Sequence, residues 1–172
     1  MTMTTRRHVL SGSAALAGLV AFGSRARADV PAGRDPFDYE VTRSEADWRA
    51  LLGDAYPIMR GGKTEPQRSS PLWAESAPGA YHCKGCDLKH YDAELKVNLP
   101  KGWLFFTASE PNSQLMSQDG PAEMADASTA LDVAIEVHCR RCGSHIGHIL
   151  LVSGRVLHCI NGAALHFSPA DT

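Results

Sequence analysis

The chain has 172 residues, of which 17 are basic and 19 acidic, so its formal net charge is −2 at pH 7. This length is enough for one domain with a real hydrophobic core. Because the balance is slightly acidic and no basic run stands out, nucleic acid and anionic membrane surfaces are not expected as partners.

Residues 1–28 have the pattern of an export signal. Arg6 and Arg7 precede an apolar stretch rich in Gly, Ser and Ala, which ends in the small-x-small sequence Ala26-Arg27-Ala28. The paired arginines resemble a twin-arginine signal. The apolar stretch is shorter than the roughly 20 residues that a membrane-spanning helix needs. We therefore expect cleavage after Ala28, with a general-secretory signal or an uncleaved anchor as the alternatives.

Removal of this segment would leave 144 residues. It takes away four arginines and no acids, so 13 basic residues would face 19 acidic ones and the net charge would be −6. We expect a soluble periplasmic or secreted protein that has no stable membrane association after cleavage.

The first part of the mature chain is predicted to be a lead-in followed by helical turns. Residues 29–42 are polar and contain Pro and Gly, which is typical of a loosely held terminus. Ser44 is a candidate helix cap, and Gly53 with Tyr56-Pro57 ends or breaks the helix. Four apolar residues recur between these points at near-helical spacing: Ala46, Trp48, Leu51 and Leu52.

From Gly79 onward the pattern favours short β-strands. The predicted strands are residues 81–83, 95–97, 103–107, 131–138, 146–152 and 155–160. Ser153-Gly154 predicts a tight hairpin between the last two, and residues 108–130 read as a polar loop. The predicted fold class is mainly β, an antiparallel domain over residues 43–169 with short N-terminal helices.

The cysteines divide by their spacing into four and one. Cys83 and Cys86 form one Cys-x-x-Cys pair, and Cys139 and Cys142 form another. Two such pairs supply four thiolates, which suit a closed tetrahedral Zn²⁺ site with a structural role. A redox role for the pairs is the alternative, but no thioredoxin-like βαβ pattern surrounds either one.

Cys159 stands apart from these pairs. His145 and His148 lie on the strand before the predicted hairpin turn, and a thiol near imidazoles is expected to have a lowered pKa and to act as a nucleophile. Residues three apart on a strand face opposite sides unless a bulge intervenes, and Gly147 would suit that bulge. Asn161 shares a strand face with Cys159. A buried, inert thiol is the alternative.

Together these motifs resemble the B-type methionine sulfoxide reductases, which are methionine-R-sulfoxide reductases. The resemblance covers roughly residues 40–168 and implies that family's mostly antiparallel β domain with a few N-terminal helices. The matching pieces are the two cysteine pairs, Trp48-Arg49-Ala50-Leu51-Leu52, Thr64-Glu65, Tyr81-His82-Cys83, Gly102-Trp103, Cys142-Gly143-Ser144-His145-Ile146-Gly147-His148 and Cys159-Ile160-Asn161-Gly162-Ala163-Ala164-Leu165-His166-Phe167.

The resemblance implies a reaction as well as a fold. Cys159 would attack the sulfur of methionine-R-sulfoxide in a protein, releasing methionine and leaving a sulfenic acid. His145, His148 and Asn161 would orient and protonate the sulfoxide oxygen. Trp103 would receive the substrate methyl group. The implied partners are oxidised envelope proteins and an external, thioredoxin-like thiol reductant.

The chain departs from that family pattern at three places. Leu157-His158 replaces the family's Arg-Tyr before the catalytic cysteine. The family often has an acid shortly after the histidine that corresponds to His148, whereas residues 149–152 here are apolar. We therefore expect the family's Arg–carboxylate pair to be lost as a unit. On a strand, His158 should point away from Cys159. Leu104-Phe105-Phe106 replaces Pro-Ser-Phe, and Lys101 stands where the family has its resolving cysteine.

Two other functions remain open from the sequence. The departures are compatible with a catalytically weakened, zinc-stabilised module that binds sulfoxides or senses redox state. A metalloenzyme that uses His145 and His148 as ligands is less favoured, because no carboxylate lies beside them at ligand spacing.

Overall fold

The structure is a computed structural model that describes residues 37–118 and 135–171. The predicted signal segment, residues 29–36 of the lead-in and residues 131–134 of one predicted strand lie outside the described residues.

The N-terminal helical part contains α1 (Glu45–Leu52), a 3₁₀ turn (Gly53–Ala55) and α2 (Tyr56–Met59). The Ser44 hydroxyl accepts a hydrogen bond from the Asp47 amide at 3.2 Å, so the predicted cap is confirmed. Trp48 and Leu52 are buried, whereas Leu51 is 45 % exposed and Ala46 is also exposed. The helix therefore packs through a narrower apolar stripe than its sequence predicted.

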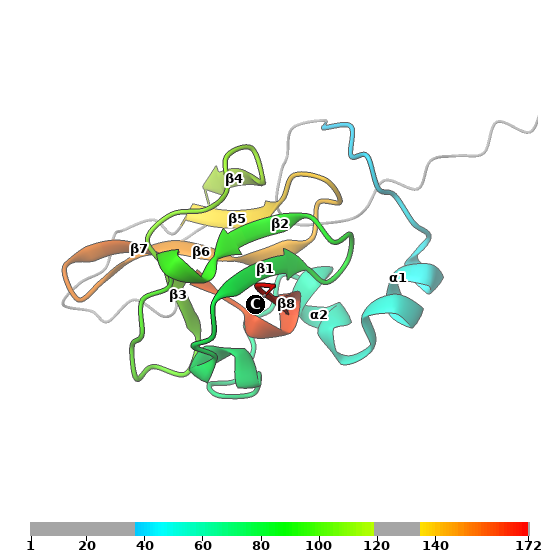
Figure 1. The fold of residues 1–172 in the computed structure, drawn as a ribbon. Helices are drawn as coiled ribbons and strands as arrows, with labels where there is room; N and C mark the ends of the chain where they lie inside the picture. The colour runs from blue at the N-terminus through cyan, green and yellow to red at the C-terminus, as the bar shows by residue number, and fades with distance from the viewer. Residues whose placement is uncertain (1–36, 119–134, 172) are drawn as a thin grey trace, which may run out of the picture.

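The described strands form two antiparallel sheets (Figure 1). The smaller sheet has the order β2-β1-β8, and the larger has the order β3-β7-β6-β5-β4. In Figure 1, β1 and β2 lie in front of β5 and β6, while α1 and α2 lie at the side opposite the β6–β7 turn. The bounds are β1 Gly79–Cys83, β2 Lys89–Asp92, β3 Leu104–Phe106, β4 Gln114–Gln118, β5 Ile135–Cys139, β6 His145–Val152, β7 Arg155–Ile160 and β8 Leu165–Pro169.

Two local predictions were wrong, and one strand was not predicted. Residues 95–97 are not a strand: a 3₁₀ turn at Ala93–Leu95 leads into a single bridge from Lys96 to Phe106. Residues 114–118, predicted as loop, form β4, and the polar stretch Lys89–Asp92 forms β2. Both unpredicted strands lie at sheet edges. An edge strand needs little apolar surface, so polar side chains hide its periodicity.

The β6–β7 hairpin matches its prediction. Ser153 and Gly154 have φ of 51° and 75°, as a two-residue turn with a left-handed backbone requires. This turn sets the register that places His148 opposite Cys159.

The core between the sheets is aromatic. Tyr91 stacks on Phe106 with ring centroids 4.0 Å apart, and Tyr81 meets Phe106 edge-on at 5.2 Å. Leu104, Ile160 and Leu165 complete this buried cluster. No helix in the described parts of the chain is long and apolar enough to cross a membrane.

Candidate active site

The two cysteine pairs meet in space, as predicted. The Sγ atoms of Cys83 and Cys142 are 3.7 Å apart, and those of Cys86 and Cys139 are 3.4 Å apart. These separations exceed the S–S bond of about 2.05 Å and suit sulfurs arranged around one ion with Zn–S bonds of about 2.3 Å. All four ligand atoms lie within 4.8 Å of one another. The residues therefore fit a four-thiolate metal site.

The four thiols do not hold their protons equally. Hydrogen bonds among them lower the pKa of Cys142 and Cys86 and raise the pKa of Cys139 and Cys83. The buried guanidinium of Arg60 donates to the Cys142 carbonyl at 3.1 Å and to the Ser144 hydroxyl at 3.3 Å. Four thiolates around a divalent cation carry a net negative charge, and Arg60 provides a nearby positive one.

The backbone turns in the same way after each pair. Asp87 has φ of 61° and Gly143 has φ of 70°. The Asp87 amide donates to the Cys83 carbonyl at 2.8 Å, and the Gly143 amide donates to the Cys139 carbonyl at 2.8 Å. The same turn thus closes both halves of the cluster.

Cys159 lies on β7 in a row of cross-strand partners. His148 of β6 is opposite it on one side, and Phe105 of β3 is opposite it on the other. Glu136 of β5 is in turn opposite His148. Cross-strand partners project from the same face of a sheet. A carboxylate, an imidazole and a thiol therefore share one face.

The pKa of Cys159 is raised, which corrects the sequence prediction. Burial raises it to about 12, the Glu65 carboxylate adds to the effect, and Lys101 opposes it. Cys159 packs in an apolar cluster with Trp103, Phe105 and Leu157. This low-polarity environment disfavours the charged thiolate.

The predicted bulge is present and brings the two histidines together. Between β5 and β6 the register shifts so that Val137 pairs with Gly147 but His138 pairs with His145. The extra residue turns His145 toward His148, and their rings meet edge-on with centroids 5.2 Å apart. Gly147 has φ of 157°, and a Cβ there would lie 2.3 Å from the Cys159 carbonyl oxygen.

His145 is held at both ring nitrogens. Its Nδ1 lies 2.6 Å from a Glu136 carboxylate oxygen, and its Nε2 lies 3.3 Å from the Asn161 amide nitrogen. The carboxylate accepts a hydrogen bond from Nδ1–H, which leaves Nε2 to accept one from Asn161. His145 and Glu136 are both buried. The orientation of His145 is therefore set from two sides.

Glu65 supports the opposite side of the site. Its carboxylate accepts hydrogen bonds from the amides of Gly162 and Ala163, and its own amide donates to the Asn161 side-chain oxygen at 3.0 Å. The Trp103 indole N–H donates to the Glu65 carbonyl at 3.0 Å. One buried residue thereby fixes Asn161, Trp103 and the turn that follows Cys159.

The comparisons with known proteins agree with this geometry. The SelR domain family matches residues 51–169. The chain belongs to this family, the B-type methionine sulfoxide reductases. It is 36 % identical over 128 residues to "Peptide methionine sulfoxide reductase MsrB" of Azotobacter vinelandii, covering 72 % of this chain and 91 % of that protein.

Two further relatives match over similar lengths. The chain is 30 % identical over 135 residues to the MsrB protein of Agrobacterium fabrum, covering 76 % of this chain and 94 % of that protein. It is 28 % identical over 136 residues to "Peptide methionine sulfoxide reductase B3" of Arabidopsis thaliana, covering 76 % and 72 % respectively.

This SelR domain differs from the pattern expected of its family on one side of Cys159. Leu157 is buried against Phe105 and Leu150. His158 points to the opposite face, as predicted, where its Nδ1 lies 3.1 Å from the Tyr91 hydroxyl. Apolar packing thus takes the place of the Arg–carboxylate pair expected from the family pattern. The raised pKa of Cys159 is consistent with that replacement.

Two buried acids of the site were missed from the sequence. Glu136 falls within the predicted strand 131–138, where acids such as Asp132 and Glu136 among apolar residues read as solvent-facing positions. Thr64-Glu65 matched the family pattern, but it lies in a polar connection that indicates no burial. The available signal for Glu136 was its place on a strand two residues from His138 and a few residues before the His-x-x-His motif.

Proposed function

We propose that this protein is a peptide-methionine (R)-S-oxide reductase, an oxidoreductase that reduces methionine-R-sulfoxide in proteins to methionine. Family membership and the names of the relatives support methionine sulfoxide reduction. The observation that carries the proposal is a lone cysteine, Cys159, which lies opposite His148 and packs against the same apolar cluster as Trp103.

The first step transfers the sulfoxide oxygen to Cys159. The Cys159 sulfur attacks the sulfoxide sulfur and forms an S–S bond, while the thiol proton passes to the sulfoxide oxygen. The S–S and S–O bonds then break as this oxygen moves to the Cys159 sulfur, which leaves methionine and a Cys159 sulfenic acid. The methionine sulfur gains two electrons and the cysteine sulfur loses two. Because the raised pKa keeps Cys159 protonated at neutral pH, the proton must leave the sulfur as the new bond forms.

His148 is placed to transfer that proton, and His145 helps to position His148. His148 lies across from Cys159, where it can pass the proton to the sulfoxide oxygen. His145 contacts His148 through its ring and is itself held by Glu136 and Asn161. We assign His145 and Asn161 as residues that position His148 and the substrate oxygen. Trp103 offers an aromatic surface to the substrate S-methyl group.

The sulfenic acid is then reduced by an external thiol. The chain has five cysteines, and the four others lie together in the cysteine cluster. Two thiol groups of a reductant, of the thioredoxin-like class, would convert the sulfenic acid to the free thiol with release of water and formation of a disulfide in the reductant.

The four-cysteine cluster would hold Zn²⁺. Cys83, Cys86, Cys139 and Cys142 leave no coordination position open, so the ion would stabilise the fold. It would join the β1–β2 turn to the β5–β6 turn.

The direct test is turnover of a methionyl-sulfoxide peptide with dithiothreitol, measured separately on the R and S epimers. We expect turnover of the R epimer alone and its loss in Cys159→Ser. Equal activity of wild type and Cys159→Ser would overturn the proposal.

The raised pKa of Cys159 favours one competing function, a sulfoxide-binding or redox-sensing module. In that module Cys159 would be oxidised to a sulfenic acid once and would not be reduced back to the thiol. Many turnovers per chain in the same assay would exclude it, and a single turnover would replace the enzyme proposal with it.

We also propose that residues 1–28 direct export through a twin-arginine pathway and that oxidised envelope proteins are the substrates. Fusion of this segment to a reporter that is active only after export tests the first part. Replacement of both Arg6 and Arg7 by Lys should abolish export of the reporter.

A further inference from the structure

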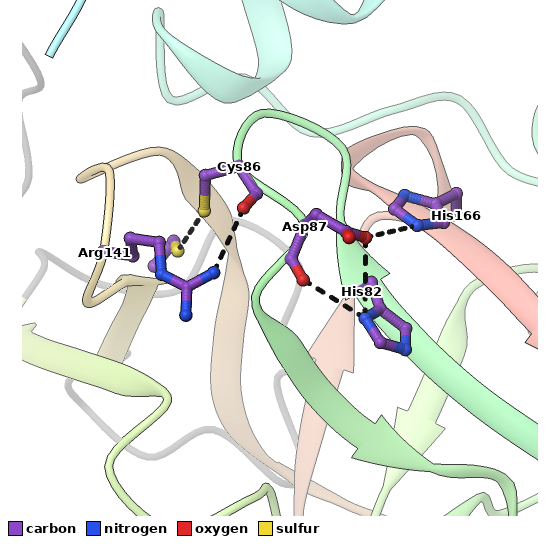
Figure 2. Close-up of polar contacts among 6 residues, drawn as sticks. His82, Cys86, Asp87, Arg141 and His166 are labelled. Carbon is purple, nitrogen blue, oxygen red and sulfur yellow. Dashed lines mark hydrogen bonds and ion pairs between the residues drawn. The ribbon is translucent and has the colours of Figure 1, made fainter. Parts of the chain in front are cut away.

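Three side chains outside the candidate active site converge on the surface of the smaller sheet. His82 of β1 and His166 of β8 are cross-strand partners. Asp87, in the turn that closes the first cysteine pair, reaches between them (Figure 2). We propose that these three residues bind a second divalent transition-metal ion of the Zn²⁺ class.

The distances fit a single ion. His166 Nε2 lies 2.9 Å from Asp87 Oδ1, and His82 Nδ1 lies 3.6 Å from the same oxygen. Ligand atoms that surround an ion with bonds of about 2.1 Å are roughly 3 to 4 Å apart. One ligand atom from each of the three residues lies within 4.8 Å of the other two. Two imidazoles and one carboxylate are a donor set that suits borderline ions such as Zn²⁺, Ni²⁺ and Cu²⁺.

The ligands are held in place by structure that exists without the ion. The two imidazole rings are stacked, 5.4 Å apart and 19° from parallel, because paired strands present them side by side. The Asp87 backbone is in the left-handed region and is tied to Cys83 by its amide hydrogen bond. Little side-chain entropy is therefore lost when an ion binds.

The site would be open and would depend on the cysteine cluster. The side chains of His82, His166 and Asp87 are 21 %, 43 % and 78 % exposed, so solvent can fill the remaining coordination positions. Figure 2 shows Asp87 directly beside Cys86 on the same turn. An ion here would join the edge strand β8 to β1 and to this turn.

His82 also has an alternative partner that an ion must displace. Its Nδ1 lies 3.2 Å from the Asp87 carbonyl oxygen. When Nδ1 carries the hydrogen it donates to that carbonyl, so an ion bound at Nδ1 replaces this hydrogen bond and requires the tautomer with the hydrogen on Nε2.

The test is the number of zinc ions bound by the full chain. All proteins carry Cys159→Ser, so that the lone thiol cannot bind added zinc, and all start with one zinc in the cysteine cluster. Titration calorimetry with Zn²⁺, checked by elemental analysis, is expected to reveal one further equivalent. Its affinity should fall at least about tenfold in His166→Ala and in Asp87→Asn.

The matched control is Asp92→Asn. Asp92 is an exposed acid of the neighbouring strand β2 and pairs with Lys89 at 2.6 Å. This variant should bind the second ion unchanged. Retention of the zinc ion in the cysteine cluster reports an intact fold. If His166→Ala loses this ion, His166→Gln is used in its place. Binding of only one zinc by the background protein, or an unchanged second equivalent in both ligand variants, would overturn the proposal.

Discussion

At the scale of single residues, two buried acids hold the groups of the site in place, and one of them also disfavours the thiolate of Cys159. Glu136 accepts a hydrogen bond from His145 and fixes its tautomer. Glu65 organises Asn161 and Trp103 but also raises the pKa of Cys159. Positioning of the surrounding groups thus takes precedence over activation of the thiol.

The raised pKa of Cys159 predicts how its alkylation depends on pH. Iodoacetamide reacts with the thiolate, whose fraction at pH 7 is about 10⁻⁵ for a pKa of about 12. The rate at Cys159 should rise about tenfold per pH unit from pH 7 to 9. In denatured protein it should level off above about pH 9, because an ordinary cysteine has a pKa of about 8.5.

Mass spectrometry of the Cys159 peptide from the zinc-loaded protein measures this rate without interference from the other thiols. A plateau near pH 7 in the native protein would mean that the thiolate is stabilised instead.

The Glu136–His145 contact predicts a catalytic defect at a distance from the thiol. Glu136→Gln removes the carboxylate that fixes the His145 tautomer, so kcat should fall by about tenfold to 100-fold while KM changes little. The assay is turnover of the R-sulfoxide peptide across pH. Glu94→Gln, which changes an exposed acid, is the control and should retain full activity. An unchanged kcat in Glu136→Gln would show that the contact is only structural.

At the scale of elements, the β6 bulge and the tight β6–β7 hairpin together define the active site. The hairpin turn sets which residues are opposite each other, and the bulge decides which side chains share a face. A one-residue change in either would separate His145 or His148 from Cys159.

Gly147→Ala should therefore damage stability and activity together. The added Cβ would lie 2.3 Å from the Cys159 carbonyl and 2.9 Å from the Ile160 Cα, which are both backbone atoms. We expect the free energy of unfolding to fall by about 3 kcal/mol, as for an overpacked core site. Urea denaturation measures it.

Gly154→Ala is the matched control in the same hairpin. Gly154 has φ of 75°, but a Cβ there would have no heavy atom within 4 Å. Only backbone strain applies, so the cost should be about 1 kcal/mol and activity should persist. Equal costs at the two positions would contradict the assigned role of close packing at Gly147.

At the scale of the whole molecule, the cysteine cluster connects parts of the chain that are distant in sequence. Cys83 and Cys86 flank the turn between β1 and β2, and Cys139 and Cys142 flank the turn between β5 and β6. These turns belong to different sheets. A metal bound between them would hold the two sheets together near the site.

Removal of the metal should therefore unfold the protein. Structural zinc contributes on the order of 10 kcal/mol of apparent binding free energy, which is comparable to the stability of a typical domain. Purified protein is expected to contain zinc, and a strong chelator should abolish its cooperative thermal transition. A zinc-free protein that still unfolds cooperatively at the same temperature would contradict this prediction.

The motifs that the sequence predicted share a local cause. Cys-x-x-Cys spacing, the Ser153-Gly154 turn and the bulge at Gly147 each depend on a few neighbouring residues with a special backbone or donor atom. The same holds for the Ser44 cap. The edge strands β2 and β4 were not predicted, because pairing with a distant strand, and not local periodicity, makes them strands.

The sequence alone determined the family, the donor set of the metal cluster and the identity of Cys159 as the cysteine left over. Those depend on residue types and spacing, which are visible in one dimension. Only the tertiary structure decided that Glu136 holds His145, that Glu65 joins Asn161 to Trp103, and that Cys159 has a raised pKa. Burial and hydrogen bonding between distant segments set those properties, and neither can be read from the residues nearby in the chain.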